Sequence, residues 1–568
     1  MKNLKAHYKL LIYLFLLLNT SSIIFAKNLD KFSKAENISN YFSGILAIND
    51  SQYQKSHNFL KSLNNLENSH YRYSQYFQYS LITLRKFKDA ANYSKKLEKK
   101  KIDNFESNLI SGIYYLKNKD FDKAKFYFKK LRNKNLPGSM QNLVANSLNS
   151  WSHFADVDNL KSALSLLDTL PKKFQNIQNI QKVFAYCYFD SNKTDEEFKK
   201  LTSNPNVNYS RYFFFHTNYL ASKKNKQKAK ETLKSYLKIY PKNLILNQFK
   251  LNLEKEKKFN NQFDCRNSNH VIAEILYIVS NALASQENYV VSNFYLILAK
   301  YLNSDFLSYD VLYAENLYKI KRFNAAKKIY HQIKEYGSTF SWYASKQIAY
   351  ILIEQEKKKE ALSYLKNSFQ KIKIPTVYEI FDYARFLKNN EKFEESVKYY
   401  SEVLSLIETK HELYGQVLDG RGTAYERIDQ WDKAEVDLLN SLIVSPENAY
   451  VINYLAYSWI EKEINIKKSL KMLRKANTLR PNDGYIIDSL GWALFKLKNY
   501  KEAKKHLELA VQYMPSDPVV NDHYADALWR NNKTLQARYY WNYVLRLKET
   551  EEELKKKIEK KLLFGLKS

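Results

Sequence analysis

Apolar and polar residues follow each other along most of the chain with the spacing of amphipathic helices. In "DGYIIDSLGWALFKLKNYKEAKKHLELAVQYMPSDP", residues 483–518, large apolar residues stand three or four apart at Ile487, Leu490 and Leu494. This spacing places them on one face of a helix. A second face follows at Ala503, Leu507 and Ala510. The segment therefore predicts two helices joined by a short turn.

The same pattern recurs about every 34 residues. Counted from the first helical residue of a unit, small residues occupy positions 8 and 20, and a proline often stands at position 32. The units that fit begin near residues 37, 71, 105, 210, 273, 307, 342, 377, 415, 449, 484 and 518. Small residues at positions 8 and 20 allow two helices to approach closely, and the proline ends the second helix. The stretch 139–209 is long enough for two degenerate units, and 244–272 fits none well.

A 34-residue period with these landmarks resembles the tetratricopeptide repeat. The resemblance is strongest in residues 415–517, where Gly491, Ala503, Ala510 and the prolines are in register. It implies an all-α fold, a right-handed superhelical solenoid of helix-turn-helix repeats. The tail 550–568 predicts a capping helix, because Leu554, Ile558 and Leu562 share one face.

The repeat pattern and its breaks suggest a division of the chain into six parts. The expected boundaries are a signal peptide at 1–26, an N-terminal array at 27–243, an irregular junction at 244–272, a middle array at 273–410, a regular C-terminal array at 411–549 and the capping helix at 550–568.

The N-terminus has the features of an export signal. Three lysines precede the apolar run Leu10–Leu18, and a polar stretch ending at Ala26 follows. This order is typical of a secretory signal peptide, and nine apolar residues are few for a membrane span. We expect cleavage after Ala26 and a periplasmic protein; an uncleaved N-terminal anchor is the alternative. The C-terminal repeats also resemble those of large exported bacterial tetratricopeptide-repeat proteins, which implies a scaffold associated with the cell envelope.

The chain is strongly basic, with 91 Lys and Arg against 59 Asp and Glu, a formal net charge of +32. Removal of residues 1–26 leaves 88 basic and 59 acidic residues, or +29. Runs such as "KKLEKKK" indicate solvated outer faces, or a surface that associates with anionic envelope polymers or membrane. A helical-repeat RNA-binding protein would also suit this charge. The export signal disfavours that role, so no nucleic acid is expected.

Two cysteines, Cys187 and Cys265, stand 78 residues apart. An exported protein can form disulfides, but we expect two buried, unbridged small residues because of this separation. No Cys/His cluster has the spacing of a metal site.

Catalytic motifs are scarce. "HELYG" at 411–415 begins like the zinc-protease motif, but Gly415 stands where the second histidine would be needed. Repeats account for nearly all of the chain and leave no segment long enough for a catalytic domain. The sequence therefore predicts no enzyme, no cofactor and no small-molecule substrate.

Binding of protein or peptide partners is the function that the repeat implies. In this family, positions 2, 5, 9 and 12 of the first helix of each pair line a concave groove. The candidate groove residues are Asp419, Tyr450, Asn453, Tyr457, Tyr485, Asp488, Trp492, Asp522, Asp526 and Trp529. Aromatic anchors and carboxylates suit an extended peptide with basic or amide groups. Trp492 and Trp529 have an alternative role, which is packing against the adjacent repeat.

Overall fold

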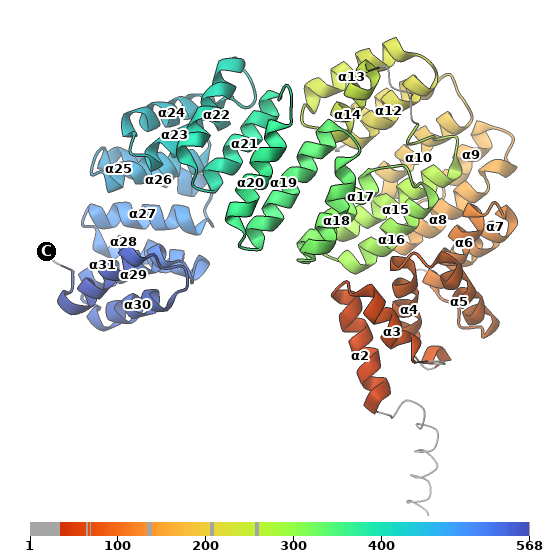
Figure 1. Ribbon diagram of the computed structural model, residues 1–568, viewed down its shortest axis with the longest axis horizontal. Helices are drawn as coiled ribbons and strands as arrows, with labels where there is room; N and C mark the ends of the chain where they lie inside the picture. The colour runs from red at the N-terminus through yellow and green to blue at the C-terminus, as the bar shows by residue number, and fades with distance from the viewer. Residues whose placement is uncertain are drawn as a thin grey trace, which may run out of the picture. The chain divides into compact units, whose positions relative to one another are not determined.

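A computed structural model describes residues 35–63, 66–68, 70–132, 139–204, 209–255 and 261–566 (Figure 1). These residues form thirty α-helices and three short 3₁₀-helices, and no strand occurs among them. The predicted all-α repeat fold is confirmed. The predicted signal peptide, 1–26, lies outside the described residues. The chain divides into two compact units, the first up to Tyr364 and the second from Leu365.

The first unit contains eighteen complete α-helices among its described residues. They are α2 (Ala35–Asn49), α3 (Tyr53–Lys61), α4 (Tyr71–Thr83), α5 (Phe87–Lys99), α6 (Phe105–Lys117), α7 (Phe121–Arg132), α8 (Met140–Ser152), α9 (Leu160–Leu167), α10 (Gln175–Tyr188), α11 (Thr194–Thr202), α12 (Ser210–Ser222), α13 (Lys226–Ile239), α14 (Leu244–Glu254), α15 (Ser268–Ser285), α16 (Tyr289–Leu302), α17 (Ser308–Lys319), α18 (Phe323–Lys334) and α19 (Ser338–Glu354). The 3₁₀-helices are η1 (Leu66–Asn68), η2 (Phe154–Asp156) and η3 (Lys172–Phe174).

The boundary between the units falls within α20 (Lys358–Gln370), and the second unit continues the pairs after it. Its helices are α21 (Val377–Asn389), α22 (Phe393–Leu406), α23 (Tyr414–Arg427), α24 (Trp431–Val444), α25 (Ala449–Glu461), α26 (Ile466–Leu479), α27 (Gly484–Lys496), α28 (Tyr500–Tyr513), α29 (Pro518–Arg530), α30 (Thr534–Arg546) and α31 (Glu552–Phe564).

The turn inside the helix pairs repeats one backbone conformation. In most pairs a residue with positive φ lies in the turn between the two helices, at Ser51, Arg85, Lys119, Asp190, Lys224, Glu287, Lys321, Glu356, Glu391, Asp429, Glu463, Lys498 and Asn532. The next residue closes the turn; for example, Asn499 N–H donates to the Leu494 carbonyl at 2.9 Å. This is the left-handed ending common at helix C-termini. The 34-residue period is thus a backbone period as well as a side-chain one.

Small residues bring the paired helices together, as their positions predict. A Cβ atom on Gly491 would lie 2.7 Å from Cγ of Leu507, so only glycine permits this approach without displacing the partner helix. In three units with serine at position 20, its hydroxyl donates to the position 8 carbonyl: Ser56 to Gly44 at 2.8 Å, Ser292 to Ser280 at 2.9 Å and Ser396 to Ala384 at 3.0 Å. Each pair therefore has a tight seam, and its remaining apolar face packs on its neighbours.

The first unit folds back on itself. Helix α16 packs against α4 and α6, and α15 packs against α8, although these helices are far apart in sequence. Figure 1 shows α15 and α16 beside α8 and α6. The rings of Tyr79 and Phe294 are 4.6 Å apart, and Lys117 donates to the Leu302 carbonyl at 3.2 Å. One apolar core runs through the unit from Ile48 to Leu312.

The expectation of two unbridged cysteines is wrong. Cys187, at the end of α10, and Cys265, just before α15, form a disulfide with their Cα atoms 5.9 Å apart. Both side chains are buried, as expected. The separation of 78 residues misled the prediction, because successive helices return the chain to α10.

The irregular segment 244–272 lies inside the first unit. It contains α14 and a loop that Asn218 of α12 fastens by donating to the Phe263 carbonyl at 2.7 Å. The degenerate stretch 139–209 contains α8 to α11, and Trp151 there donates to the Gln181 side chain at 3.0 Å. Among the described residues, no helix combines the length and apolar character needed to span a membrane.

Candidate partner-binding groove

We define the inner face of a repeat by positions 2, 5, 9 and 12 of its first helix. In the second unit these positions lie on α21, α23, α25, α27 and α29, with α21 against α23, α25 against α27 and α27 against α29. In this unit, most contacts between helices join a helix to the next one along the chain or to the one after that. The inner face of the second unit is therefore built by consecutive first helices.

Position 2 carries the most exposed of the predicted groove residues. Tyr450 is 54% exposed and Tyr485 is 58% exposed, and Val519, one repeat further on, is 44% exposed. The Arg480 guanidinium lies 5.2 Å from the centre of the Tyr450 ring, a cation–π arrangement within the chain. Along this edge, large side chains are available to a partner.

Position 5 of α27 is buried and has a partner within the chain. The Asp488 carboxylate lies 3.0 Å from Nδ1 of His523, and both side chains are almost fully buried. Burial alone would lower the pKa of His523, but the charge and hydrogen bond of Asp488 outweigh it, so the pKa is raised. Asp488 therefore joins α27 to α29.

Trp492 covers this pair. Its ring stacks on His523 with centroids 3.9 Å apart, and its indole N–H donates to Glu461 at 2.6 Å. Trp492 is half-buried. It thus contributes to packing between repeats while keeping some surface exposed.

The capping helix α31 supplies a lysine to the carboxylates of α29. Lys561 donates to Asp522 at 2.7 Å and to Asp526 at 2.8 Å, and Asp526 also accepts from the Trp541 indole at 3.0 Å. Burial, and then the charge of Asp522, raise the pKa of Asp526 to about 6. Trp529 lies against Gly565, so close that a Cβ there would collide with its ring. At this end of the array, the inner-face carboxylates Asp522 and Asp526 are therefore paired with Lys561 of α31.

The remaining predicted residues lie deeper between the first helices. Burial raises the pKa of the Asp419 carboxyl, an effect that the Lys388 ammonium opposes. The Oδ1 atom of Asn453 is buried, without a hydrogen-bond partner among the described residues. Tyr457 is half-buried, and burial, then Glu461, raise its pKa. None of these three is as accessible as Tyr450 or Tyr485.

Two partners of the groove residues were missed at the sequence level. His523 stands at position 6 of its helix, outside the four groove positions, and Lys561 lies in a tail with many lysines. The four-residue spacing of Asp522 and Asp526 puts both on one helix face, a signal that a cation would meet them. Which lysine pairs with Asp522 and Asp526 depends on how α31 packs against α29.

The inner face of the first unit is buried at α4 and α6. Tyr79, at position 9 of α4, is 4% exposed because Phe294 of α16 packs on it. Glu106, at position 2 of α6, is 3% exposed and accepts from Gln75 at 2.7 Å. A cavity of about 440 Å³ remains where α16 begins, lined in part by Gln75, Tyr79 and Asn288. Helix α16 thus occupies the place where a partner would bind.

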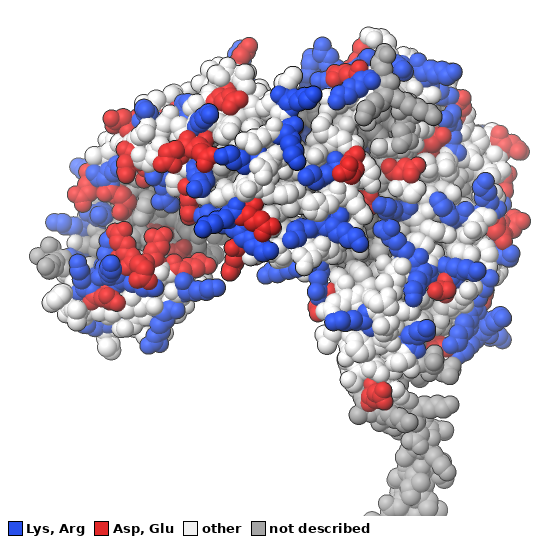
Figure 2. Space-filling view, in the orientation of Figure 1, with Lys and Arg blue, Asp and Glu red and all other residues white. Residues whose placement is uncertain are grey.

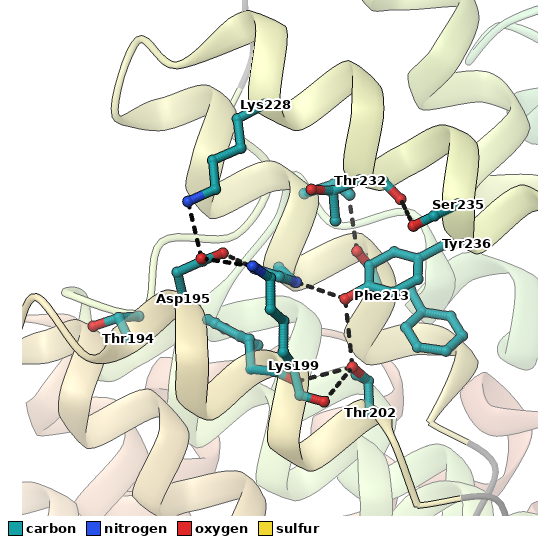
Figure 3. Close-up of polar contacts among 12 residues, drawn as sticks. Thr194, Asp195, Lys199, Thr202, Phe213, Lys228, Thr232, Ser235 and Tyr236 are labelled. Atoms are coloured by element: carbon teal, nitrogen blue, oxygen red, sulfur yellow. Dashed lines mark hydrogen bonds and ion pairs between the residues drawn. The ribbon is translucent and has the colours of Figure 1, made fainter.

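The first unit also contains a buried chain of polar groups (Figure 3). Asp195 lies 2.7 Å from one ring nitrogen of His216, and the Tyr236 hydroxyl lies 2.7 Å from the other. Lys228 and Lys199 pair with the same carboxylate at 2.9 and 3.0 Å. Burial lowers the pKa of His216 to about 4. His216 is fully buried, and the network joins α11, α12 and α13.

The two units differ in charge. Residues 1–364 contain 57 Lys and Arg and 30 Asp and Glu, a net charge of +27, whereas residues 365–568 contain 34 and 29, a net charge of +5. In Figure 2, basic side chains dominate the visible face of the first unit, and acidic ones are more frequent on that of the second. Within the described residues, no group of three or more His, Cys, Asp or Glu is placed to hold a metal ion.

Comparison with known proteins gives matches to repeat proteins. A family model described as "Tetratricopeptide repeat" matches residues 320–550. A "TPR repeat-containing protein PA4667" of Pseudomonas aeruginosa is 27% identical over 143 residues, 24% of this chain and 22% of that protein, so the match spans about a fifth of the relative's length.

Two solved structures illustrate the structural likeness. A tetratricopeptide repeat protein from Parabacteroides merdae is 18% identical, with a TM-score of 0.31, over 39% of this chain and 86% of that one. The Cut9–Hcn1 hetero-tetramer of the APC/C gives 13% identity and a TM-score of 0.35, over 90% of this chain and 94% of that one.

Proposed function

Because this chain is a tetratricopeptide-repeat protein, we propose that it is an exported, non-catalytic scaffold that binds protein or peptide partners through the inner face of its second unit. Its place would be the periplasm, in assembly or maintenance of the cell envelope. The observation that carries the proposal is the contrast between the units: α16 packs on α4 and α6 of the first, where the inner face is buried, whereas Tyr450 and Tyr485 remain exposed on the second.

The export part of the proposal has two independent supports. The N-terminal sequence is typical of a secretory signal peptide. The Cys187–Cys265 disulfide suits an oxidising compartment, since disulfides are rare in the cytosol of mesophiles. Fractionation of cells and mass spectrometry of the mature N-terminus test this part. A mature chain beginning at Lys27 in the periplasm is expected, and an intact Met1 in the cytosol would contradict it.

Site-specific photo-crosslinking tests the groove. Tyr450 or Tyr485 is replaced by p-benzoylphenylalanine in the full-length protein, expressed in its own cells and irradiated. The matched control is Tyr539 on α30, which is 67% exposed on a second helix. Crosslinked partners are expected at 450 and 485 and not at 539. The same adducts from all three positions, or none from 450 and 485, would refute binding at this face.

A second candidate function rests on the charge of the first unit. Without residues 1–26 this unit has 54 Lys and Arg against 30 Asp and Glu, a net charge of +24, which favours association with anionic envelope polymers or lipid headgroups. Sedimentation with vesicles containing phosphatidylglycerol, at low and high salt, tests this role. Salt-sensitive binding would support it, and equal sedimentation with neutral phosphatidylcholine vesicles would exclude it.

A further inference from the structure

The inner-face edge of α27 differs from that of α25 in one respect that points to a ligand. On α25, the Tyr450 ring has a guanidinium of its own chain, that of Arg480, 5.2 Å from its centre. Arg480 follows α26 and stands just before Pro481. One repeat later, the residue just before the proline is Met514. Tyr485, the counterpart of Tyr450, therefore receives no cation from the corresponding position.

Carboxylates cap the N-termini of α27, which carries Tyr485, and of α29, which packs against it. Asp483 caps α27 and accepts from the Tyr485 N–H at 3.1 Å, and Asp517 caps α29 in the same way. Partial burial, and then the carboxylates of Asp517, Glu549 and Asp483, raise the pKa of the Tyr485 phenol. An exposed aromatic ring in such a field favours a cation over its face.

We propose that the edge of the inner face at Tyr485 binds a cationic segment of a partner polypeptide, with an arginine or lysine side chain placed over the Tyr485 ring as Arg480 is placed over Tyr450. This inference rests on the proposed function and specifies the chemistry of the partner. Asp483, Asp517 and Glu549 supply the attraction, and Tyr485 supplies the contact surface. The net charge of the mature chain, +29, would repel such a segment, and these local carboxylates oppose that repulsion.

Peptide binding to the full mature protein tests the proposal. The probe is a fluorescein-labelled peptide of alternating arginine and glycine, and its matched control contains citrulline, the neutral isostere of arginine. We expect the arginine peptide to bind at least tenfold more tightly at low salt. Its affinity should fall as salt rises, since the attraction is between exposed charges.

Variants assign the binding to this edge. Tyr485→Ala should weaken the arginine peptide about three- to tenfold, whereas Tyr485→Phe, which keeps the ring, should bind normally. The combination Asp483→Asn, Asp517→Asn and Glu549→Gln keeps both helix caps and should remove most of the salt dependence. Tyr539→Ala is the control and should leave binding unchanged.

Three results would overturn the proposal. They are equal binding of arginine and citrulline peptides, equal loss in Tyr485→Ala and Tyr539→Ala, and self-association of the protein that Tyr485→Ala abolishes, because the occupant would then be a second copy. Crosslinking from residue 485 without any preference for arginine would refute only the cationic chemistry. Absence of crosslinks at residues 450 and 485 would instead refute the proposed function.

Discussion

The two units are built from the same kind of helix pair, but they differ in how much of the inner face is exposed. In the first unit the chain returns and lays α16 across α4 and α6, so that Tyr79 and Glu106 on the inner face are buried. In the second unit helices contact mainly their neighbours in the repeat order, and Tyr450 and Tyr485 stay exposed. A repeat array can thus bury its inner face within one chain or keep it for a partner.

In the first unit, an ion pair and a disulfide join parts of the chain that are far apart in the sequence. Arg211 of α12 pairs with the fully buried Glu274 of α15 at 2.6 Å, and its guanidinium lies 3.8 Å from the centre of the Tyr277 ring. The disulfide joins α10 to the segment before α15. Both links connect a helix before residue 223 to α15 or to the segment just before it.

The largest expected change in stability comes from truncating a side chain of α16 that packs on the inner face of the first unit. Phe294→Ala removes a ring that is 1% exposed and packs on Tyr79. Large-to-small changes of this kind cost about 3–5 kcal/mol of unfolding free energy. Urea denaturation should show this loss in the transition of the first unit. A loss below about 1 kcal/mol would mean that α16 is not firmly seated.

Removing the disulfide should have the next largest effect. The variant with Cys187→Ala and Cys265→Ala should lose about 2–4 kcal/mol, since the crosslink restricts the unfolded chain. Thiol titration of the denatured wild-type protein without reductant should find no free thiol. A matched control is the wild-type protein with reductant, which should approach the stability of the variant. Two free thiols in protein from the periplasm would contradict the bridge.

Acid should weaken the first unit through His216. In the fold this histidine stays neutral to about pH 4, whereas in the unfolded chain it takes up a proton near its ordinary pKa of 6.5. Its contribution is therefore complete above pH 6.5 and declines as the pH falls towards 4, by about 2–3 kcal/mol. Asp195, Lys199, Lys228 and Tyr236 surround it.

Denaturation at several pH values between 4 and 7 measures this decline. His216→Gln should lower stability at pH 7 and flatten the dependence in this range. Asp195 does not confuse the result, because its lowered pKa affects stability only below about pH 4. A wild-type profile as flat as that of His216→Gln would show that His216 does not titrate as the structure indicates.

The sequence predicted what each repeat determines locally. Several predicted starts, such as Gly484 and Pro518, are the first residues of helices, because apolar spacing and small residues act within one pair. The path of α16 over α4 depends on contacts more than 200 residues apart, which no local pattern encodes. The same limit explains the missed bridge at Cys265 and the unforeseen pairing of Lys561 with Asp522.

Turn chemistry should respond equally in both units, because both share the left-handed residue between paired helices. Lys119→Gly and Lys498→Gly each relieve a positive φ that side chains disfavour. Each should gain about 0.5–1 kcal/mol. Lys505→Gly, on an exposed position inside α28, should instead cost about 1 kcal/mol. Thermal unfolding of the three variants measures these shifts, and a gain confined to one unit would contradict a common turn.

The smallest expected effect on stability is the most informative about function. Tyr485→Ala removes a side chain that is 58% exposed, and exposed positions usually change stability by no more than about 0.5 kcal/mol. Compared with Phe294→Ala, the same kind of truncation should be almost neutral. Denaturation of the second unit should therefore match wild type while partner crosslinking declines. A loss above about 1 kcal/mol would show that Tyr485 belongs to the packing, and the second unit would then be closed by its own side chains as the first is by α16.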